Sequence, residues 1–452
     1  MTKIFYARVD EFWRKEEKYK YLEAQQHCGN VEWQELTPDA KQTWLTEGMH
    51  SDFGSFLPMG TKESKSAEQQ SAHAIFKTYS NGVKTNRDVW TYSFNDFILA
   101  ENIKRIIATY NDHQSRWSHR EDKDQKVDDF VDYDEKKISW SENLKLDLQR
   151  GHKAEFKVEK IRASIYRPFT KQKLYFDRML NERVYGMPAI FPTPEAGNEN
   201  RIICLSGVGH DIFRCQMTNL VVELKFSNSA NGGTQCFPFY TYNEDGTNRR
   251  ENITDWALEQ FRNHYHDQAI TKWDIFHYVY GVLHHPVYRE RYAANLKREL
   301  PRILFTPDFH AFASAGAHLA ELHVNYESQP EYPLEKIENP KAKLDWRVEK
   351  MKLSKDKLQI VYNDFLTLDG IPTEAFAYRL GNRSALDWVI DQYRVSTDKR
   401  SQITNDPNRA NDPEYIVRLI GQVITVSLET MKIVNALPTL GIEASLPVIK
   451  DD

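Results

Sequence analysis

Short strands follow one another through the middle of the chain, and this spacing constrains the fold more than any other feature. The stretches IRASIY, KLYFD, RIICLSG, NLVVELKF and QCFPFYTY occur between Ile161 and about Tyr242, separated by Gly, Pro, Asn and Asp. Short runs of β-branched and aromatic residues between such breakers are typical of strands. The sequence therefore predicts a mainly β core in this region.

Helical patterns lie on both sides of the predicted strands. Thr254 is placed to cap one helix, and Pro286 begins another that ends before Pro301. The other predicted elements are a helix from about Asn95 to Trp117, a helix over Trp273–His284, a strand over Leu358–Tyr362, and closing helices over Ser384–Tyr393 and Pro413–Val434. We therefore expect the α+β fold class, with helical insertions and a helical C-terminal end.

The N-terminal stretch reads as the end of a small α/β layer. Ile4–Val9 and Val31–Leu36 are predicted strands, and Asp10–His27 is a charged helical stretch between them. The segment Thr61–Ala72 lacks periodicity and reads as a surface loop or a boundary. Since 452 residues exceed what one hydrophobic core can organise, two or three packed units are expected.

The composition narrows the class of protein. Apolar residues make up 40% and charged residues 28%, which is typical of an ordered protein. The four cysteines have no CxxC pair, so we expect reduced, buried thiols and neither a zinc site nor a disulfide framework. The N-terminus has no apolar signal core, and no apolar run is long enough for a bilayer, so we expect a cytoplasmic protein without a membrane partner.

No motif of the chain supports catalysis. Methyl transfer to an adenine amino group needs an Asn/Asp-Pro-Pro-Tyr/Phe loop for the base and a glycine-containing loop for the methyl donor, and neither is found. NDPN ends in Asn408 where an aromatic residue is needed, and it reads as a turn. The nucleophile sequence GxSxG is also absent. We expect no catalytic residue, no bound cofactor and no metal in this chain.

The charge distribution points to nucleic acid. The whole chain has a formal net charge of −5, yet Arg150–Arg183 holds ten Lys or Arg against four Asp or Glu. The stretch Ile165–Pro192 places cations between aromatic residues, a mixture suited to gripping a phosphate backbone and touching bases. The predicted DNA contacts of this segment are Arg167, Lys171, Arg178 and Arg183.

Three further clusters fit the same chemistry. In GVKTNRD, Gly82 lets the backbone turn, and the donors for phosphate oxygens are Lys84, Thr85, Asn86 and Arg87. The segment Tyr378–Arg409 offers Arg for guanine and Asn for adenine in the major groove, and its candidates are Arg379, Asn382, Arg383, Arg400, Asn405, Asn408 and Arg409. A fourth, weaker cluster is the pair Arg249 and Arg250.

Each cluster also has an ordinary structural interpretation. A charged stretch is usually a solvated surface. Arg167 in particular is a candidate for an internal ion pair, with a residue such as Asp177. Only the clustering of these residues favours nucleic-acid contact over that interpretation.

Four long blocks carry a resemblance to a known family. IYRPFTKQKLYFDRMLNERVY, QCFPFYTYNEDGTNRRENITDWAL, DIFHYVYGVLHHPVYRERYAANLKRELPRI and YRLGNRSALDWVIDQYRVSTDKRSQITNDPNR resemble the C-terminal region of type ISP restriction-modification enzymes. The likeness runs from Lys3 to about Pro438, nearly the whole chain. In that family a nuclease and a translocating ATPase precede an adenine-N6 methyltransferase, and the target-recognition domain comes last.

The resemblance implies a division of the chain. Residues 1–74 resemble the tail of the methyltransferase domain, 75–345 the core of the target-recognition domain, and 346–452 its C-terminal helical part. The donor-binding loop, the NPPY loop, the helicase motifs and the nuclease are absent, so the chain resembles a fragment or a separately encoded subunit. The resemblance implies S-adenosylmethionine, ATP and Mg for the missing domains and none for this chain.

The leading expectation is a module that reads a short site on double-stranded DNA, so that a methyltransferase and a translocase-nuclease supplied elsewhere can act. The alternative is a protein-interaction scaffold, or an inactive fragment, whose strand at Ile4–Val9 docks on the methyltransferase core without touching DNA. A third and weaker alternative is an enzyme in its own right, which binding of S-adenosylmethionine by the isolated chain would support.

Overall fold

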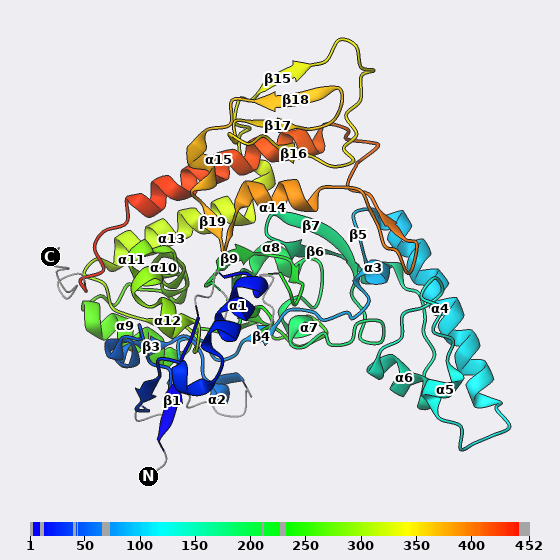
Figure 1. Ribbon diagram of the computed structural model, residues 1–452, viewed down its shortest axis with the longest axis horizontal. Coiled ribbons are helices and arrows are strands. Elements are labelled where there is room, and N and C mark those ends of the chain that lie inside the picture. The colour runs from blue at the N-terminus through cyan, green and yellow to red at the C-terminus, as the bar shows by residue number, and fades with distance from the viewer. Residues whose placement is uncertain are drawn as a thin grey trace. The chain divides into compact units, whose positions relative to one another are not determined.

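The computed structural model describes residues 3–9, 13–38, 42, 44–65, 73–209, 212–226 and 232–442 of the chain (Figure 1). The chain divides into two compact units, Met1–Ser51 and Asp52–Asp452. The family-implied boundaries after residues 74 and 345 stay predictions.

The described residues of the first unit form one α-helix and one pair of strands. β1 (Ile4–Tyr6) and β2 (Gln34–Leu36) pair antiparallel, with Ile4 opposite Leu36. Between them lie α1 (Lys15–Gln25) and the 3-10 turn η1 (Cys28–Asn30). The predicted strand–helix–strand order is thus confirmed, although Asp10 lies outside the described residues. None of the residues of α1 is buried within the chain.

Two four-stranded sheets form the β core of the second unit. One sheet has the order β10-β6-β7-β5 and the other β4-β11-β8-β9. The strands of the first are β5 (Tyr92–Ser93), β6 (Ile161–Arg167), β7 (Thr170–Tyr175) and β10 (Val221–Val222). Those of the second are β4 (Ser80–Asn81), β8 (Ile202–Leu205), β9 (Cys215–Thr218) and β11 (Gln235–Pro238).

Alternate residues of β8 face two different parts of the core. Ile202 and Cys204 pack in one hydrophobic cluster with residues of the first sheet, while Ile203 and Leu205 pack against the helices that follow. Successive side chains of a strand point to opposite faces. Because both faces are covered, all four residues of β8 are buried and its sequence is continuously apolar.

Helices follow these strands along the chain, as the sequence predicts, and pack against the second sheet. They are α9 (Asp255–Tyr265), α10 (Lys272–His284), α11 (Pro286–Arg291), α12 (Ala293–Leu296) and α13 (Phe309–Val324). The hydroxyl of Thr254 accepts the N–H of Ala257, which confirms the predicted cap. An added Cβ at Gly316 of α13 would lie 1.8 Å from the carbonyl oxygen of His277 in α10. Glycine at this position therefore allows the two helices to cross in backbone contact.

A helical arm projects from the first sheet and has its own core. Its helices are α3 (Asp88–Thr91), α4 (Asp96–Ser118), α5 (Val127–Phe130) and α6 (Glu142–Gln149). The side-chain amide oxygen of Asn95 accepts the N–H groups of Phe97 and Ile98 and so caps α4 at its predicted start. The arm is cyan in Figure 1, and Ile403 from far along the chain joins its hydrophobic cluster.

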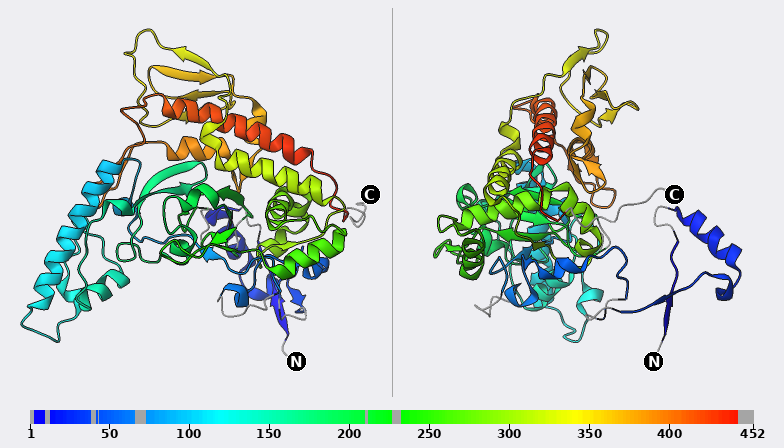
Figure 2. Two further views of the ribbon diagram at one scale, coloured as in Figure 1. Left: turned by 180° about the vertical axis from the view of Figure 1, so that it is seen from behind. Right: turned by 90° about the vertical axis from the view of Figure 1, so that its left-hand side faces the viewer.

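The described C-terminal part has two long helices and a four-stranded sheet as its main elements. α14 (Ala385–Gln392) and α15 (Tyr415–Asn435) match the predicted closing helices. The antiparallel sheet β15-β18-β17-β16 consists of β15 (Glu335–Glu338), β16 (Lys352–Leu353), β17 (Gln359–Val361) and β18 (Leu366–Asp369). Only β17 was expected from the sequence. In both views α13 runs between α10 and α15 (Figures 1 and 2).

Short elements complete the second unit. The remaining strands pair as β3 (Leu57–Pro58) with β14 (Arg302–Ile303), β12 (Tyr240–Thr241) with β13 (Arg250–Glu251), β19 (Arg379–Leu380) with β20 (Arg383–Ser384), and β21 (Ser396–Thr397) with β22 (Thr404–Asn405). The remaining helices and 3-10 turns are η2 (Ser51–Ser55), α2 (Lys62–Lys65), η3 (Val158–Lys160), α7 (Met187–Ile190), α8 (Ala196–Glu199), η4 (Tyr326–Ser328) and η5 (Thr373–Phe376). The predicted loop Thr61–Ala72 holds α2, and its residues 66–72 lie outside the described residues.

No described helix is both long enough and apolar enough to cross a membrane.

Candidate nucleic-acid interface

The first two basic clusters of the sequence meet at one pair of residues. The N–H of Lys84 donates to the carbonyl of Arg183 (2.8 Å), and the N–H of Arg183 donates to the carbonyl of Lys84 (2.9 Å). Residues that exchange both bonds across an antiparallel pair send their side chains to the same face. Lys84 is half-buried and Arg183 exposed, and neither forms an ion pair with any described residue. Two cations thus lie opposite each other without a counter-charge.

Close packing, not a turn, explains Gly82 in this cluster. An added Cβ at Gly82 would lie 2.6 Å from the carbonyl oxygen of Glu223. Its neighbour Val83 exchanges backbone hydrogen bonds with Val222 (2.7 Å) and Leu224 (2.8 Å). Gly82 does not adopt the left-handed conformation that is typical of a turn glycine. The absence of a side chain lets this segment lie directly on β10.

Arg87 and Thr85 hold the cluster from inside. Arg87 is 3% exposed, and its guanidinium donates to the carbonyls of Ser139 (3.0 Å) and Leu180 (2.7 Å) and to the hydroxyl of Ser141 (2.5 Å). Burial lowers the pKa of Arg87 to about 10. The buried hydroxyl of Thr85 accepts the N–H of Arg87 (3.1 Å). Both side chains therefore position the segment and leave the exposed Asn86 between them facing outward.

Arg167 forms an internal ion pair. Its guanidinium lies 2.5 Å from a carboxylate oxygen of Glu223 and 4.0 Å from the ring centre of Tyr166. The partner is not Asp177, which pairs with Lys160. Burial raises the pKa of Glu223 to about 7. The pair fastens β6 to the segment after β10.

Lys171 has a partner from the helical end of the chain. Its ammonium lies 2.9 Å from Glu327, whose other carboxylate oxygen accepts the hydroxyl of Tyr415 (2.7 Å). Nearby, the fully buried Phe169 packs edge-on against Tyr326, with ring centres 5.2 Å apart. The turn between β6 and β7 is therefore anchored in the C-terminal core.

The remaining cations of these clusters are exposed. Arg178 pairs with Glu244, and Arg249 pairs with Glu199. Arg250 is exposed in β13 and forms no ion pair with the described residues. Exposed pairs contribute about 0 to 1 kcal/mol, so such cations can exchange a carboxylate for a phosphate at little cost.

In the third cluster, one hairpin presents three of the predicted residues. Arg379 and Arg383 lie in the paired strands β19 and β20, and the guanidinium of Arg379 donates to the carbonyl of the exposed Asn382 between them. Arg383 pairs with Asp391 (2.8 Å) and lies 5.0 Å from the ring of Trp388. Its side chain is still 40% exposed.

Two amides of the third cluster are used inside the protein. Asn408 accepts the N–H of Val348 and donates to its carbonyl, both at 2.8 Å. Asn405 accepts the N–H of Phe94 (3.0 Å) and donates to the side chain of Gln172 (3.2 Å). The bonds of Asn405 tie the loop to β7 and to the residue after β5, so the first and third clusters are connected through an internal amide.

The last two cations of the third cluster lie near the surface. Arg400 pairs with Glu135 of the arm (3.0 Å) and is 76% exposed. Arg409 is exposed and lies 3.2 Å from the ring centre of Tyr415. The orange hairpin β21–β22 reaches the cyan arm in Figure 1, in agreement with the first of these contacts.

Comparison with protein families matches residues 74–419 to the Type ISP C-terminal specificity domain. This match covers more than half of the chain. The chain belongs to this family. The likeness in the quoted sequence blocks is thus confirmed, and the fold agrees with the same region of solved Type ISP enzymes.

Three solved structures are similar to this chain over 97% of its length. A nuclease-deletion mutant of the Type ISP restriction-modification enzyme LlaGI in complex with a DNA substrate mimic is 33% identical, with a TM-score of 0.83. A DrdV–DNA complex is 36% identical, with a TM-score of 0.84. The ATP-dependent Type ISP restriction-modification enzyme LlaBIII bound to DNA is 28% identical, with a TM-score of 0.83.

The chain, which includes this Type ISP specificity domain, spans 39%, 43% and 28% of these three chains, respectively. The comparison with curated proteins found no match.

The structure of the specificity domain also shows residues that the sequence did not single out. Glu223 and Glu327 neutralise two of the predicted contacts, Arg167 and Lys171. Tyr185, two residues after Arg183, is 44% exposed in a left-handed conformation (φ 47°). In the sequence, only the glycine after Tyr185 indicates an unusual backbone there, and a glycine at that place does not show that the tyrosine before it is exposed in a left-handed conformation.

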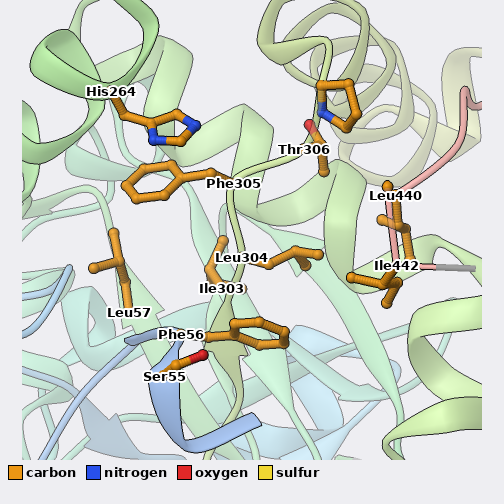
Figure 3. A pocket seen from close by; sticks show the side chains of 12 residues that line it. Ser55, Phe56, Leu57, His264, Ile303, Leu304, Phe305, Thr306, Leu440 and Ile442 are labelled. Atoms are coloured by element: carbon orange, nitrogen blue, oxygen red, sulfur yellow. The ribbon is translucent and has the colours of Figure 1, made fainter. Parts of the chain in front are cut away.

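A cavity of about 450 Å³ in the second unit is not suited to nucleic acid (Figure 3). Its walls are mostly apolar and include Phe56, Leu304 and Ile442, while the ring of His264 stacks on Phe305 at 4.0 Å. No Lys or Arg lines it.

The four cysteines of the chain are free thiols. Cys204, Cys215 and Cys236 are buried, and burial raises the pKa of Cys215 to about 12. Cys28 is exposed, so the expectation of a buried thiol is wrong there. The described residues contain no group of three or more His, Cys, Asp or Glu that would hold a metal ion.

Proposed function

We propose that this chain is the DNA target-recognition module of a Type ISP restriction-modification enzyme. It reads a short duplex site so that an adenine-N6 methyltransferase and an ATP-dependent nuclease, supplied by a longer chain or a partner, can act. The observation that carries the proposal is the opposed pair Lys84 and Arg183. The DNA in the structures of its relatives LlaGI, DrdV and LlaBIII supports the same role.

The opposed pair has the chemistry of a phosphate site. Like charges directly opposite on paired strands destabilise the pair. Since no described carboxylate neutralises Lys84 or Arg183, a bound anion would remove that repulsion. A phosphate group accepts charge-assisted hydrogen bonds from an ammonium and a guanidinium at once. A DNA phosphate between these two side chains would fix the register of the protein on the duplex.

The remaining predicted contacts divide by their surroundings. We propose that the exposed members contact DNA together with the opposed pair; they are Arg178, Arg249, Arg250, Arg379, Asn382, Arg383, Arg400 and Arg409. The members with internal partners hold these contacts in position; they are Thr85, Arg87, Arg167, Lys171, Asn405 and Asn408.

Duplex binding by the full chain tests the proposal. The apparent Kd for a labelled 30-base-pair duplex of mixed sequence would be measured by fluorescence anisotropy at several salt concentrations. Counterion release predicts that log affinity falls with log salt by about 0.9 for each phosphate contact. A chain without DNA affinity even at low salt would favour the protein-interaction scaffold instead.

We further propose that the first unit docks on the rest of the methyltransferase domain. Helix α1 buries no residue within the chain, and the side chains of Phe5 and Trp33 are 53% and 47% exposed. Apolar side chains exposed in such numbers mark a surface for another protein. Co-purification of the chain with a methyltransferase segment of a Type ISP enzyme, and its loss on Phe5→Asp, would test this partner.

The cofactors of the whole reaction would bind outside this chain. We assign S-adenosylmethionine to the methyltransferase part, and ATP and Mg to the translocase-nuclease part. A module that reads DNA would act in the cytoplasm.

A further inference from the structure

Tyr185 has a backbone conformation that a bulky residue rarely adopts. Its φ is 47°, in the left-handed region, where side chains other than those of Gly, Asn and Asp are uncommon. Such outliers cluster at binding sites, where the surrounding structure maintains them. The left-handed backbone at Tyr185 is therefore a reason to look for a binding role of this residue.

The neighbours of Tyr185 hold it in this conformation. Val184 is 5% exposed and Met187 is fully buried, while the N–H of Gly186 donates to the hydroxyl of Ser80 (2.8 Å). On the other side, the backbone of Arg183 is bonded to Lys84. Because both flanks are fixed, the chain turns at Tyr185 and its side chain projects outward.

The ring of Tyr185 has no internal role among the described residues. Its side chain makes no hydrogen bond, ring contact or cation–π contact with any of them, and the residue is 44% exposed. Asn86 repeats the arrangement on the other strand: it follows Lys84 by two residues, is exposed and has φ 58°. Each unpaired cation is thus followed by an outward-facing residue with a left-handed backbone.

We propose that Tyr185 is a nucleobase contact that stacks on a DNA base next to the phosphate held by Lys84 and Arg183. The inference rests on the proposed function, because it needs DNA at this surface. An aromatic ring beside cations is the combination that binds an unstacked base and the adjoining backbone. A base whose pairing is disturbed, by a mismatch or by extrusion, exposes the face that the ring needs.

Two duplexes and four variants test the contact. The probes are two labelled 30-base-pair duplexes of the same mixed sequence, one fully paired and one with a central T·T mismatch. The full chain would carry Tyr185→Phe, Tyr185→Ala or Tyr185→Gly. The matched control is Tyr133→Ala, which removes another exposed tyrosine (54% exposed) from the arm.

We expect the wild-type chain to prefer the mismatched duplex. Tyr185→Ala and Tyr185→Gly should weaken binding to that duplex about fivefold or more, since stacking on an aromatic side chain stabilises a base by roughly 1 to 3 kcal/mol. Tyr185→Phe should keep the affinity, and Tyr133→Ala should match the wild type. The slope against log salt should not change, because no phosphate contact is lost.

A stability measurement separates lost contact from lost fold. Glycine accepts the left-handed conformation and alanine does not, so Tyr185→Gly should unfold at a higher temperature than Tyr185→Ala while losing as much affinity. Wild-type affinity of Tyr185→Ala for the mismatched duplex would overturn the inference and leave the proposed function intact. Absence of DNA binding by the wild-type chain would overturn both.

Discussion

The side-chain ammonium of Lys171 lies 2.9 Å from a carboxylate oxygen of Glu327, which is 156 residues further along the chain. This contact joins the β6–β7 hairpin to the helical C-terminal part. Burial acts to raise the pKa of Glu327, but the charge and hydrogen bond of Lys171 and the hydroxyl of Tyr415 lower it on balance. Glu327 is therefore ionised at neutral pH and neutralises a cation that the sequence alone assigned to DNA.

We expect Glu327→Gln to weaken the fold without weakening DNA binding. The substitution leaves the half-buried Lys171 without its counter-charge, which should lower the free energy of unfolding by about 1 to 3 kcal/mol. Urea unfolding gives the stability, and duplex anisotropy gives the affinity. Glu429→Gln, which removes the partner of the exposed Lys432, is the control and should change neither. A clear gain of affinity at unchanged stability would return Lys171 to the DNA contacts, because its ammonium, freed from the carboxylate, would then bind a phosphate.

The sequence predicts local structure well in this chain because the signals are local. The cap at Thr254 is three residues from the N–H that it accepts, and the strand periodicity of β6 and β7 is contained in a few residues. The basic clusters are also visible without a structure, since charge and aromatic spacing are properties of short segments. Their chemistry was therefore predictable, and their partners were not.

The partners are set by contacts between distant segments. Lys84 meets Arg183, Arg167 meets Glu223, and Asn408 meets Val348, and the order of the strands between them fixes each meeting. The sequence pattern can predict an exposed side chain whose polar atoms are in fact bonded to a distant segment, as the amide of Asn408 is. The same limit explains why the exposed Tyr185 was missed, because its conformation depends on how Val184 and Met187 are buried.

Arg383 should be tested with a neutral substitution. Charge reversal to Glu would place a second carboxylate beside Asp391. A loss of DNA binding could then come from repulsion between the new carboxylate and DNA as well as from the lost arginine contact. We expect Arg383→Gln to keep the fold and to relax base preference, since one good bidentate contact discriminates by roughly 1 to 3 kcal/mol. Selection from a random duplex library by the wild-type chain and the variant should show the same motif with one or two positions degenerate. An unchanged motif would exclude Arg383 from base reading.

Acid should destabilise the second unit through buried histidines. Burial lowers the pKa of His323 to about 3 and that of His284 well below its usual value. Below pH about 6.5 both histidines bind a proton in the unfolded state, whereas in the folded state their rings stay neutral down to the lowered pKa. As the pH falls from about 6.5 towards the folded pKa, each histidine therefore lowers the free energy of unfolding. Glu223 acts in the opposite direction between pH about 4.5 and 7, because burial raises its pKa to about 7.

A variant isolates the histidine contribution from that of Glu223. We expect His284→Leu to reduce the fall in unfolding free energy between pH 6.5 and 5 by about 1.1 kcal/mol per pH unit relative to the wild type. Urea unfolding at several pH values measures both slopes. Parallel curves would show that His284 has the same protonation in the folded and unfolded states.

The salt dependence of duplex binding by Lys84→Ala, Arg183→Ala and the double variant tests the central claim most directly. If one phosphate lies between the two side chains, each single variant should lose most of the affinity that the double variant loses, and the slope of log affinity against log salt should become shallower by about 0.9. Lys432→Ala, on the exposed surface of α15, should keep the wild-type slope. A folded double variant with the affinity and slope of the wild type would contradict the account.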